Sequence, residues 1–447
     1  MRIRVRRARR LTGRVAVPGD KSISHRAALL GALASGRTEI TGFLEGEDCL
    51  ATLKAVRALG AEVTRKGPGH YLVDGTGVDG LTEPDNVIDC GNSGTSARLL
   101  VGVLAGQPFW TVLTGDDSLR SRPMDRVAEP LRCMGATVVG RREGSRLPLA
   151  VRGTRPLKAL TYASPVASAQ VKTALLLAGL WADGPVTVRE PTPSRDHTER
   201  MLGGFGARLT VGPEGITLTP GAQLAGQPVA VPGDISSAAF FLVAAAVAPE
   251  AEVTVTQVGT NPTRTGVLEV LHAMGAQIQF VRGQSVTSQS VTGNPAAAEP
   301  SADLVMRGGV LQGTEIGGAL VPRLIDEVPI LAVAACLAEG PTEIRDAAEL
   351  RVKESDRIRA VATELGRLGA RITERPDGLR IEGGARLHGA VVQSGGDHRM
   401  AMALVVAGLL ADGETVVEDT ECIATSFPGF LNAVNDLAGT QAARAES

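Results

Sequence analysis

The sequence has 447 residues, of which 43% are hydrophobic and 21% are charged. These values exclude disordered, collagen-like and disulfide-scaffold proteins. The net charge of -2 and an aromatic content of 3% exclude a basic or base-stacking surface for nucleic acid. No apolar run approaches 18 residues, so we expect a cytoplasmic protein without membrane contact. The histidines never recur at HxxxH spacing and no Cys-x-x-Cys pair occurs, so we expect no metal site.

The chain opens with six arginines between Met1 and Arg10. Ile3 and Val5 alternate with them, which predicts a strand with one buried face rather than an arm that binds nucleic acid. We expect residues 1–16 to complete the last structural unit of the chain, which otherwise lacks a strand.

A pattern of apolar helix, Ala-x-Gly turn and β-branched strand then recurs along the chain. Its six copies lie at 27–40, 99–113, 173–188, 238–255, 331–344 and 400–417. A second helix tends to end at a Gly-Ala pair, with the glycine at Gly60, Gly135, Gly206, Gly275 and Gly369. The pattern predicts an α/β fold of six βαβαββ repeats, with the very apolar first helices inside and the sheets outside.

The tetrapeptide Val-Pro-Gly-Asp occurs twice, at 17–20 and 231–234. The separation matches about three repeats, so we expect the chain to cross between two lobes at these places. One lobe would comprise 1–18 plus 232–447, and the other 19–231. The segment 282–302, rich in Ser, Gly, Pro and Ala, is predicted to be an exposed loop or hairpin tip.

Polar segments precede the first helix of the first three repeats, at 20–26, 90–98 and 164–172. Each alone is typical of an ordinary N-cap. Together, and each with a cation or a long amide, they favour binding of phosphate or carboxylate at helix N-termini. Lys21, Lys172 and Lys353 lie in such polar segments although the chain otherwise prefers arginine. A compact ammonium suits a point contact to phosphate or a proton transfer, although chance placement competes with this interpretation.

The second half of the chain carries charge clusters beside apolar helices, at 323–329, 351–357 and 396–402. For 353–359 a solvated helix face with ion pairs is the favoured interpretation. Asp326 differs, because the apolar residues around it predict burial. A buried carboxylate needs a partner or a function.

Taken together, these segments resemble the enolpyruvyl transferase family. The resemblance extends over about residues 10–432 and rests on six motifs, at 20–26, 91–95, 122–124, 168–172, 351–357 and 397–400. It implies a two-lobed inside-out α/β barrel. It also implies transfer of the enolpyruvyl group of phosphoenolpyruvate to the 5-hydroxyl of shikimate 3-phosphate, with release of phosphate. No metal or organic cofactor is implied, and we expect a monomer.

The resemblance also implies roles for single residues. Asp326 would be the base on the 5-hydroxyl, Glu354 would shuttle the methylene proton, and Lys21 would join them as a third catalytic residue. The implied phosphoenolpyruvate contacts are Lys21, Gly94, Arg122, Gln170, Arg357 and Arg399. The implied phosphoshikimate contacts are Ser22, Arg26, Ser168, Ala169, Gln170, Ser194, Arg195, Asp326 and Lys353. Asn92 and Thr95, from the motif at 91–95, are further expected substrate contacts.

Two positions bear on specificity. Thr425 stands where one branch of the family has a lysine that contacts phosphoenolpyruvate, so that contact is not assigned to a residue of this chain. Gly94 lacks the methyl group that herbicide-tolerant relatives carry in this loop, which predicts sensitivity to glyphosate.

Two alternatives remain. One is the sister enzyme that transfers enolpyruvyl to UDP-N-acetylglucosamine, although 114–122 lacks the reactive cysteine typical of it. The other is a non-catalytic anion-binding repeat protein. Because the implied contacts divide between the two halves of the chain, we expect substrate binding to close the lobes.

Overall fold

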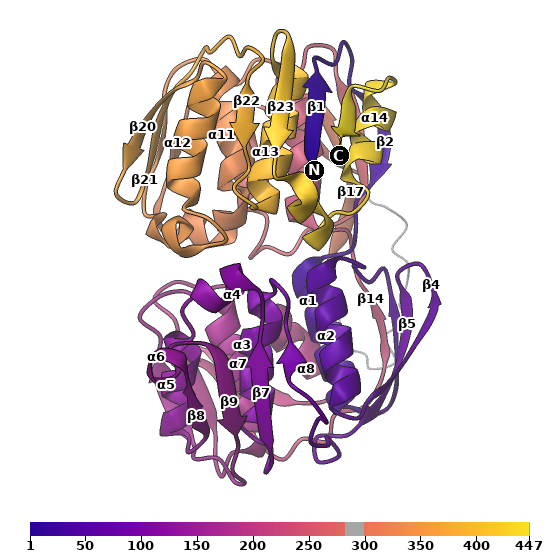
Figure 1. Cartoon of the computed structure of the whole chain (residues 1–447), viewed down its shortest axis with the longest axis vertical. Helices are drawn as coiled ribbons and strands as arrows, with labels where there is room; N and C mark the ends of the chain where they lie inside the picture. The colour runs from indigo at the N-terminus through magenta and orange to yellow at the C-terminus, as the bar shows by residue number, and fades with distance from the viewer. Residues whose placement is uncertain (282–298, 447) are drawn as a thin grey trace. The chain divides into compact units, whose positions relative to one another are not determined.

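The computed structural model describes residues 1–281 and 299–446, which form two compact units. Unit 1 contains 1–18, 232–281 and 300–446, and unit 2 contains 19–231 together with Glu299. The chain leaves unit 1 after Pro18 and returns to it at Pro232 (Figure 1). Most of the loop predicted at 282–302 lies outside the described residues, and Ser301 already belongs to a strand.

Unit 2 contains three four-stranded sheets. The first consists of β14 (Pro228–Ala230), β3 (Ser35–Thr41), β5 (His70–Thr76) and β4 (Glu62–Gly67), in that spatial order. The second consists of β6 (Ile88–Asp89), β7 (Trp110–Thr114), β9 (Arg146–Arg152) and β8 (Thr137–Gly140). The third consists of β10 (Leu160–Ala163), β11 (Val186–Arg189), β13 (Gly215–Thr219) and β12 (Arg208–Gly212).

Unit 1 contains three more sheets of the same construction. The first consists of β2 (Thr12–Ala16), β15 (Glu252–Gly259), β17 (Ser301–Arg307) and β16 (Gln277–Val281). The second consists of β18 (Glu315–Ile316), β19 (Thr342–Ile344), β21 (Gly378–Glu382) and β20 (Arg371–Arg375). The third consists of β22 (Val391–Gln393), β23 (Glu414–Glu418), β1 (Arg2–Arg6) and β24 (Ala443–Glu446).

Every sheet pairs its first two strands parallel and the other two pairs antiparallel, as six copies of one βαβαββ repeat require. The predicted repeat is therefore confirmed. The strands just before the two crossings are exchanged between repeats. β2 precedes α1 in sequence but pairs with β15, whereas β14 precedes α9 in sequence but pairs with β3. Of residues 1–16, only β1 completes the last sheet, where Ile3 is paired with Val417 and with Ala445.

The first helix of each repeat is almost entirely buried, as its apolar sequence predicts. These helices are α1 (Lys21–Leu33), α3 (Gly94–Leu104), α7 (Ala169–Ala178), α9 (Ile235–Val247), α11 (Val328–Leu337) and α13 (His398–Leu410). Small residues let them approach closely. A Cβ added at Gly102 of α3 would lie 2.4 Å from the carbonyl oxygen of Ala174 in α7, which no side chain could accommodate.

The second helix of each repeat leads into the next hairpin. These helices are α2 (Glu47–Ala58), α5 (Asp125–Cys133), α8 (His197–Gly204), α10 (Gly266–Ala273), α12 (Arg357–Arg367) and α14 (Phe430–Ala438). The glycines of the five predicted Gly-Ala pairs follow them with φ between 88° and 104°. This left-handed region strongly favours glycine, which explains why the pair marks the helix end.

The remaining elements are short. They are α4 (Asp117–Ser121), α6 (Arg141–Gly144), η1 (Gly179–Trp181), η3 (Gly318–Arg323), η4 (Ile325–Glu327), η5 (Ala348–Val352) and η6 (Thr420–Thr425). Arg142 and Glu143 have φ of 51° and 59°, so α6 is a left-handed turn rather than an α-helix.

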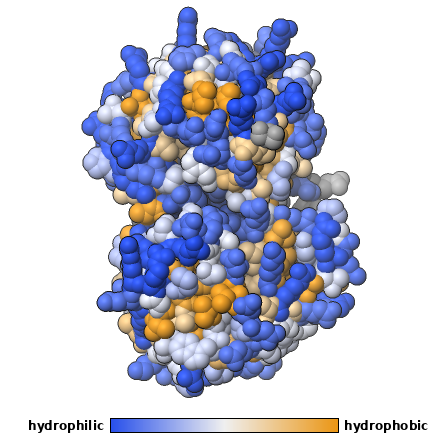
Figure 2. All heavy atoms as spheres, in the orientation of Figure 1, coloured by the Kyte–Doolittle hydropathy of each residue, from blue (hydrophilic) through white to orange (hydrophobic). Residues whose placement is uncertain are grey.

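Each unit has its own hydrophobic core, built mainly from Ala, Val, Leu and Ile. In unit 1, Phe240 and Phe241 of α9 pack against Phe427 and Phe430. Figure 2 shows that both units present a mostly hydrophilic surface with limited hydrophobic patches. Among the described residues, no helix is long and apolar enough to span a bilayer.

Candidate functional site

The three buried helices of unit 2 begin at polar side chains that cap them. Asp20 accepts the N–H of Ile23 at 2.9 Å, Ser93 accepts that of Ser96 at 3.1 Å, and Ser168 caps α7. Each cap satisfies one backbone N–H of the first turn, so the other N–H groups and the positive end of the helix dipole can still attract an anion. The helix starts that the sequence singled out therefore exist as predicted.

Arg26 is the most deeply buried cation at the start of α1. It is 3% exposed, and its guanidinium donates to Thr198 Oγ1 and Thr173 Oγ1, both at 2.7 Å. Burial lowers the pKa of Arg26 to about 10, so the side chain is still a cation at neutral pH. Lys21, at the first position of α1, forms an ion pair with Asp48.

Neighbouring predicted residues are joined by direct hydrogen bonds. Arg122 donates to the side chain of Asn92, and Gln170 donates to Thr95 Oγ1 at 3.0 Å. These contacts join two pairs of the residues predicted in unit 2, and we call the whole predicted set the unit 2 cluster. It comprises Lys21, Ser22, Arg26, Asn92, Gly94, Thr95, Arg122, Ser168, Ala169, Gln170, Ser194 and Arg195.

Three more side chains of unit 2 contact this cluster, although the sequence contains little sign of them. Asp48 pairs with Lys21, and Arg98 donates to Gln170 Oε1 at 2.8 Å. Glu190 accepts the N–H of Ser168 at 2.9 Å. Arg98 stands inside a motif named above, but nothing in the sequence distinguishes Asp48 or Glu190 from ordinary surface acids.

Lys172 does not fit the interpretation as a point contact to phosphate. Its side chain is only 2% exposed, and its ammonium lies 3.0 Å from Glu190 Oε2 and 2.7 Å from Glu199 Oε1. The third N–H of the ammonium faces the carbonyl oxygen of Ser194 at 3.4 Å, so all three donors of Lys172 have partners within the protein.

The residues predicted in unit 1 form a second group around Asp326, whose side chain is 12% exposed. Its carboxylate lies 3.2 Å from Arg357 Nη1 and 3.7 Å from both Lys353 Nζ and Arg399 Nη2. Glu354 accepts from Arg357 Nη2 at 2.7 Å. We call Asp326, Lys353, Glu354, Arg357 and Arg399 the unit 1 cluster.

Arg357 is the centre of this cluster, although a solvated helix face was expected at 353–359. Its side chain is 1% exposed, and it binds the fully buried Asp397 at 2.8 Å. Burial alone would lower the pKa of Arg357, but Asp397 and Glu354 outweigh it and raise this pKa. Burial likewise opposes ionisation of Asp397, yet Arg357 holds the pKa of Asp397 below its usual value. Both groups are therefore charged at neutral pH.

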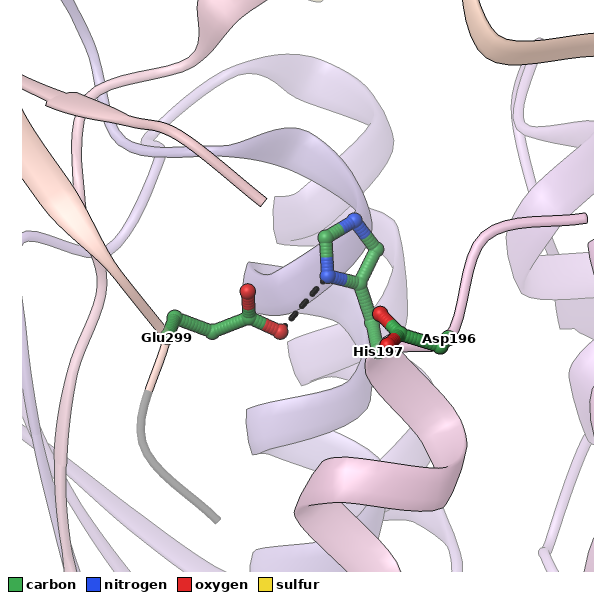
Figure 3. A group of neighbouring side chains, drawn as sticks. All are labelled: Asp196, His197 and Glu299. Atoms are coloured by element: carbon green, nitrogen blue, oxygen red, sulfur yellow. Dashed lines mark hydrogen bonds and ion pairs between the residues drawn. The ribbon is translucent and has the colours of Figure 1, made fainter. Parts of the chain in front are cut away.

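One group of side chains in the described part of the chain has donor atoms spaced for a metal ion. Asp196, His197 and Glu299 place them within 4.8 Å of one another (Figure 3). The Nδ1–H of His197 donates to Glu299 at 2.7 Å, and Arg200 donates to Asp196 at 2.8 Å. The second ring nitrogen of His197 points away from both carboxylates in Figure 3. These partners favour a hydrogen-bonded anchor at the start of α8 over a metal site.

Comparisons with known proteins are consistent across the chain. A family model described as EPSP synthase (3-phosphoshikimate 1-carboxyvinyltransferase) matches residues 5–434. A 3-phosphoshikimate 1-carboxyvinyltransferase of Geobacter sulfurreducens is 56% identical over 431 residues, which cover 96% of this chain and 98% of that protein. Its counterpart in Synechococcus elongatus is 56% identical over 433 residues, covering 96% and 94%. The solved structure of EPSP synthase from Acinetobacter baumannii aligns over 100% of both chains with a TM-score of 0.87 and 44% identity.

Proposed function

Because the chain belongs to the EPSP synthase family and has its 3-phosphoshikimate 1-carboxyvinyltransferase activity in the shikimate pathway, we propose that the two clusters carry this reaction. The substrates are phosphoenolpyruvate and shikimate 3-phosphate. Each carries a phosphate and a carboxylate, so four anionic groups need cations and N–H donors. The reaction also needs one group that removes a proton and one that supplies a proton.

In the proposed reaction, Glu354 protonates the C3 methylene of phosphoenolpyruvate, which makes C2 electrophilic. Asp326 takes the proton of the 5-hydroxyl, and the hydroxyl oxygen forms a bond to C2. The tetrahedral adduct then loses phosphate as its C–O bond breaks, and the departing phosphate takes the proton from Asp326. A methyl proton returns to Glu354, which restores the double bond. Lys21 joins the two carboxyl groups as the third proposed catalytic residue.

Asp326 and Glu354 are suited to these roles because both bind Arg357, at 3.2 Å and 2.7 Å. This shared arginine is the observation that carries the proposal. It holds the two carboxyl groups in a fixed mutual position, and Asp397 on its other side keeps the arginine in place. A base and an acid whose positions are fixed in advance do not have to be ordered during the reaction.

The substrate contacts are proposed in two sets. For phosphoenolpyruvate they are Lys21, Asn92, Gly94, Thr95, Arg122, Gln170, Arg357 and Arg399. For shikimate 3-phosphate they are Ser22, Arg26, Ser168, Ala169, Gln170, Ser194, Arg195, Asp326 and Lys353. Arg26 supports the second set, because a buried cation that hydroxyl groups already orient is a strong partner for an anion.

The deciding experiment measures phosphate release from phosphoenolpyruvate with and without shikimate 3-phosphate. We expect release only with it, and none with UDP-N-acetylglucosamine as acceptor. Release with the amino sugar would favour the sister enzyme. No release with either acceptor would favour a non-catalytic anion-binding protein.

Both units contribute proposed contacts, so we also propose that substrates bring the units together. Small-angle scattering should give a smaller radius of gyration with shikimate 3-phosphate plus glyphosate than without them. An unchanged radius would count against closure. The cytoplasmic location and the monomeric state are proposals as well, and light scattering tests the second.

A further inference from the structure

Lys172 belongs to a row of buried charges of which the proposed reaction uses only Arg26. Its neighbours Glu190 and Glu199 have side chains that are 3% and 9% exposed. Glu199 also attracts the buried guanidinium of Arg26. Positive and negative groups therefore alternate in the order Arg26, Glu199, Lys172, Glu190. Removing one member of such a row leaves a buried charge without compensation, which is costly.

Glu190 extends this row to two serines of the unit 2 cluster. Its Oε1 accepts the backbone N–H of Ser168 at 2.9 Å. Its Oε2 accepts the backbone N–H of Ser194 at 3.2 Å and the Ser194 hydroxyl at 2.9 Å. One carboxylate therefore joins the cap of α7 to the segment that precedes α8. Charge-assisted hydrogen bonds of this kind are among the stronger ones in proteins.

The segment before α8 is also held further along its length. His197, at the first position of α8, is 1% exposed and donates to Glu299 (Figure 3). Thr198 accepts from Arg26. Ser194 is thus fixed by Glu190 at one end of a segment whose other end is anchored separately.

We propose that Glu190 and Lys172 are positioning residues of the shikimate 3-phosphate site, with Glu190 setting the spacing between Ser168 and Ser194 and Lys172 holding Glu190. This inference rests on the proposed function. The hydroxyl hydrogen of Ser194 rotates from Glu190 to the substrate phosphate, while the two backbone hydrogen bonds keep both serines in place. Neither Glu190 nor Lys172 touches the substrate. Both act through the two serines.

The test is Glu190→Gln. A glutamine offers one oxygen, so one of the two backbone N–H groups then faces an amide NH2 group instead of an acceptor. We expect the KM for shikimate 3-phosphate to rise by about tenfold, whereas kcat and the KM for phosphoenolpyruvate stay within about twofold. Glu214→Gln is the control, because Glu214 is 78% exposed and pairs with Arg189 at the surface; no kinetic constant should change.

A folded Glu190→Gln protein whose melting temperature falls while both KM values stay unchanged would overturn the inference. If this variant does not fold, Glu190→Asp keeps the charge but is one methylene shorter, and the same selective rise in KM is expected. Lys172→Met should act in the same direction, because Glu190 then loses its buried counter-ion. The wild-type protein separates the two hypotheses: without phosphate release that depends on shikimate 3-phosphate the proposed function fails, whereas normal release with unaffected variants refutes only the positioning role.

Discussion

The two clusters lie in repeats of one design, yet they use different chemistry. In unit 2, two of the three first helices begin at serine, at Ser93 and Ser168. In unit 1, all three begin at an acid, namely Asp234, Glu327 and Asp397. A carboxylate that accepts N–H groups of the first turn, as those of Asp20, Asp234 and Asp397 do, partly compensates the positive end of the helix, whereas a serine leaves that charge uncompensated. Two of the helix starts in unit 2 are therefore better suited to an external anion than those in unit 1.

The difference extends to how the cations are held. In unit 1, Arg357 is enclosed by three carboxylates, those of Asp326, Glu354 and Asp397. In unit 2, Arg26 is held by the hydroxyl groups of two threonines, and Lys21 pairs with a single carboxylate, that of Asp48. We infer that the two carboxyl groups of the unit 1 cluster act mainly in the chemical step, and that the unit 2 cluster, apart from Lys21, acts mainly in binding.

Asp326→Asn should have the largest effect. The amide cannot take a proton from the 5-hydroxyl, so kcat should fall by about 10²–10⁴. Shikimate 3-phosphate should still bind, because the unit 2 cluster is intact. Arg357 keeps Asp397 and Glu354, so the fold should persist. The measurements are steady-state phosphate release and calorimetric binding of shikimate 3-phosphate. Glu315→Gln, at a carboxylate that is 76% exposed, is the control. Full turnover in Asp326→Asn would show that Asp326 is not the base.

The second prediction concerns acid stability, in which the two units should differ. Burial lowers the pKa of His25 well below its usual value, with Lys21 and Arg26 adding to this. Below about pH 6.5, His25 therefore binds a proton in the unfolded chain but not in the folded chain. The stability linked to His25 is present above that pH and is lost by about 1.4 kcal/mol per pH unit below it. The lowered pKa of Asp397 in unit 1 costs stability only at much lower pH.

His25→Gln tests this prediction by urea unfolding at about pH 7.5 and about pH 5.5. Glutamine can still meet the hydroxyl of Thr52, which the ring contacts at 2.7 Å. On going to the lower pH, the wild-type protein should lose about 1.4 kcal/mol more than the variant. Equal losses of unfolding free energy would mean that His25 binds a proton as readily in the folded chain as in the unfolded chain.

The contrast between the units also explains what could be predicted from the sequence. Helix starts, Gly-Ala ends and the sixfold repeat are local patterns that physics imposes on neighbouring residues, and these predictions were confirmed. The exchange of β2 and β14 depends on pairing between distant strands, which no local pattern reveals. The burial of Lys172 and Arg357 was missed for a similar reason. Their carboxylate partners at 190 and 397 are distant in sequence, and without them a solvated or ligand-bound cation is the better expectation.

Gly94→Ala tests whether unit 2 binds phosphoenolpyruvate. A Cβ at this position would lie 2.8 Å from Arg98 Nη1 and 3.4 Å from Arg122 Nη1. Both atoms end flexible side chains, so the fold tolerates the methyl group while the two guanidinium groups move. We expect the KM for phosphoenolpyruvate to rise by about tenfold at nearly constant kcat. Inhibition by glyphosate, the longer ligand, should weaken further.

Gly203→Ala is the matched control, because a Cβ there meets nothing within 4 Å. Glyphosate titration of the phosphate-release assay is the measurement. Full activity of the wild-type protein in millimolar glyphosate, or an unchanged KM for phosphoenolpyruvate in Gly94→Ala, would mean that Gly94 does not lie at the phosphoenolpyruvate site.

Thr425→Val should have the smallest effect, although one branch of the family has lysine at this position. Thr425 is 8% exposed, and its hydroxyl donates to the carbonyl oxygen of Cys422 at 2.7 Å. A neutral hydroxyl whose hydrogen is already donated within η6 adds little to the binding of an anion. We expect the KM for phosphoenolpyruvate to change by less than about twofold, with a loss of about 1 kcal/mol of stability. Thr420→Val, which removes a 3.0 Å hydrogen bond to Met1 from the same element, should cost a similar amount of stability. A tenfold rise in KM for Thr425→Val alone would mean that unit 1 binds phosphoenolpyruvate through η6 as well as through Arg357 and Arg399.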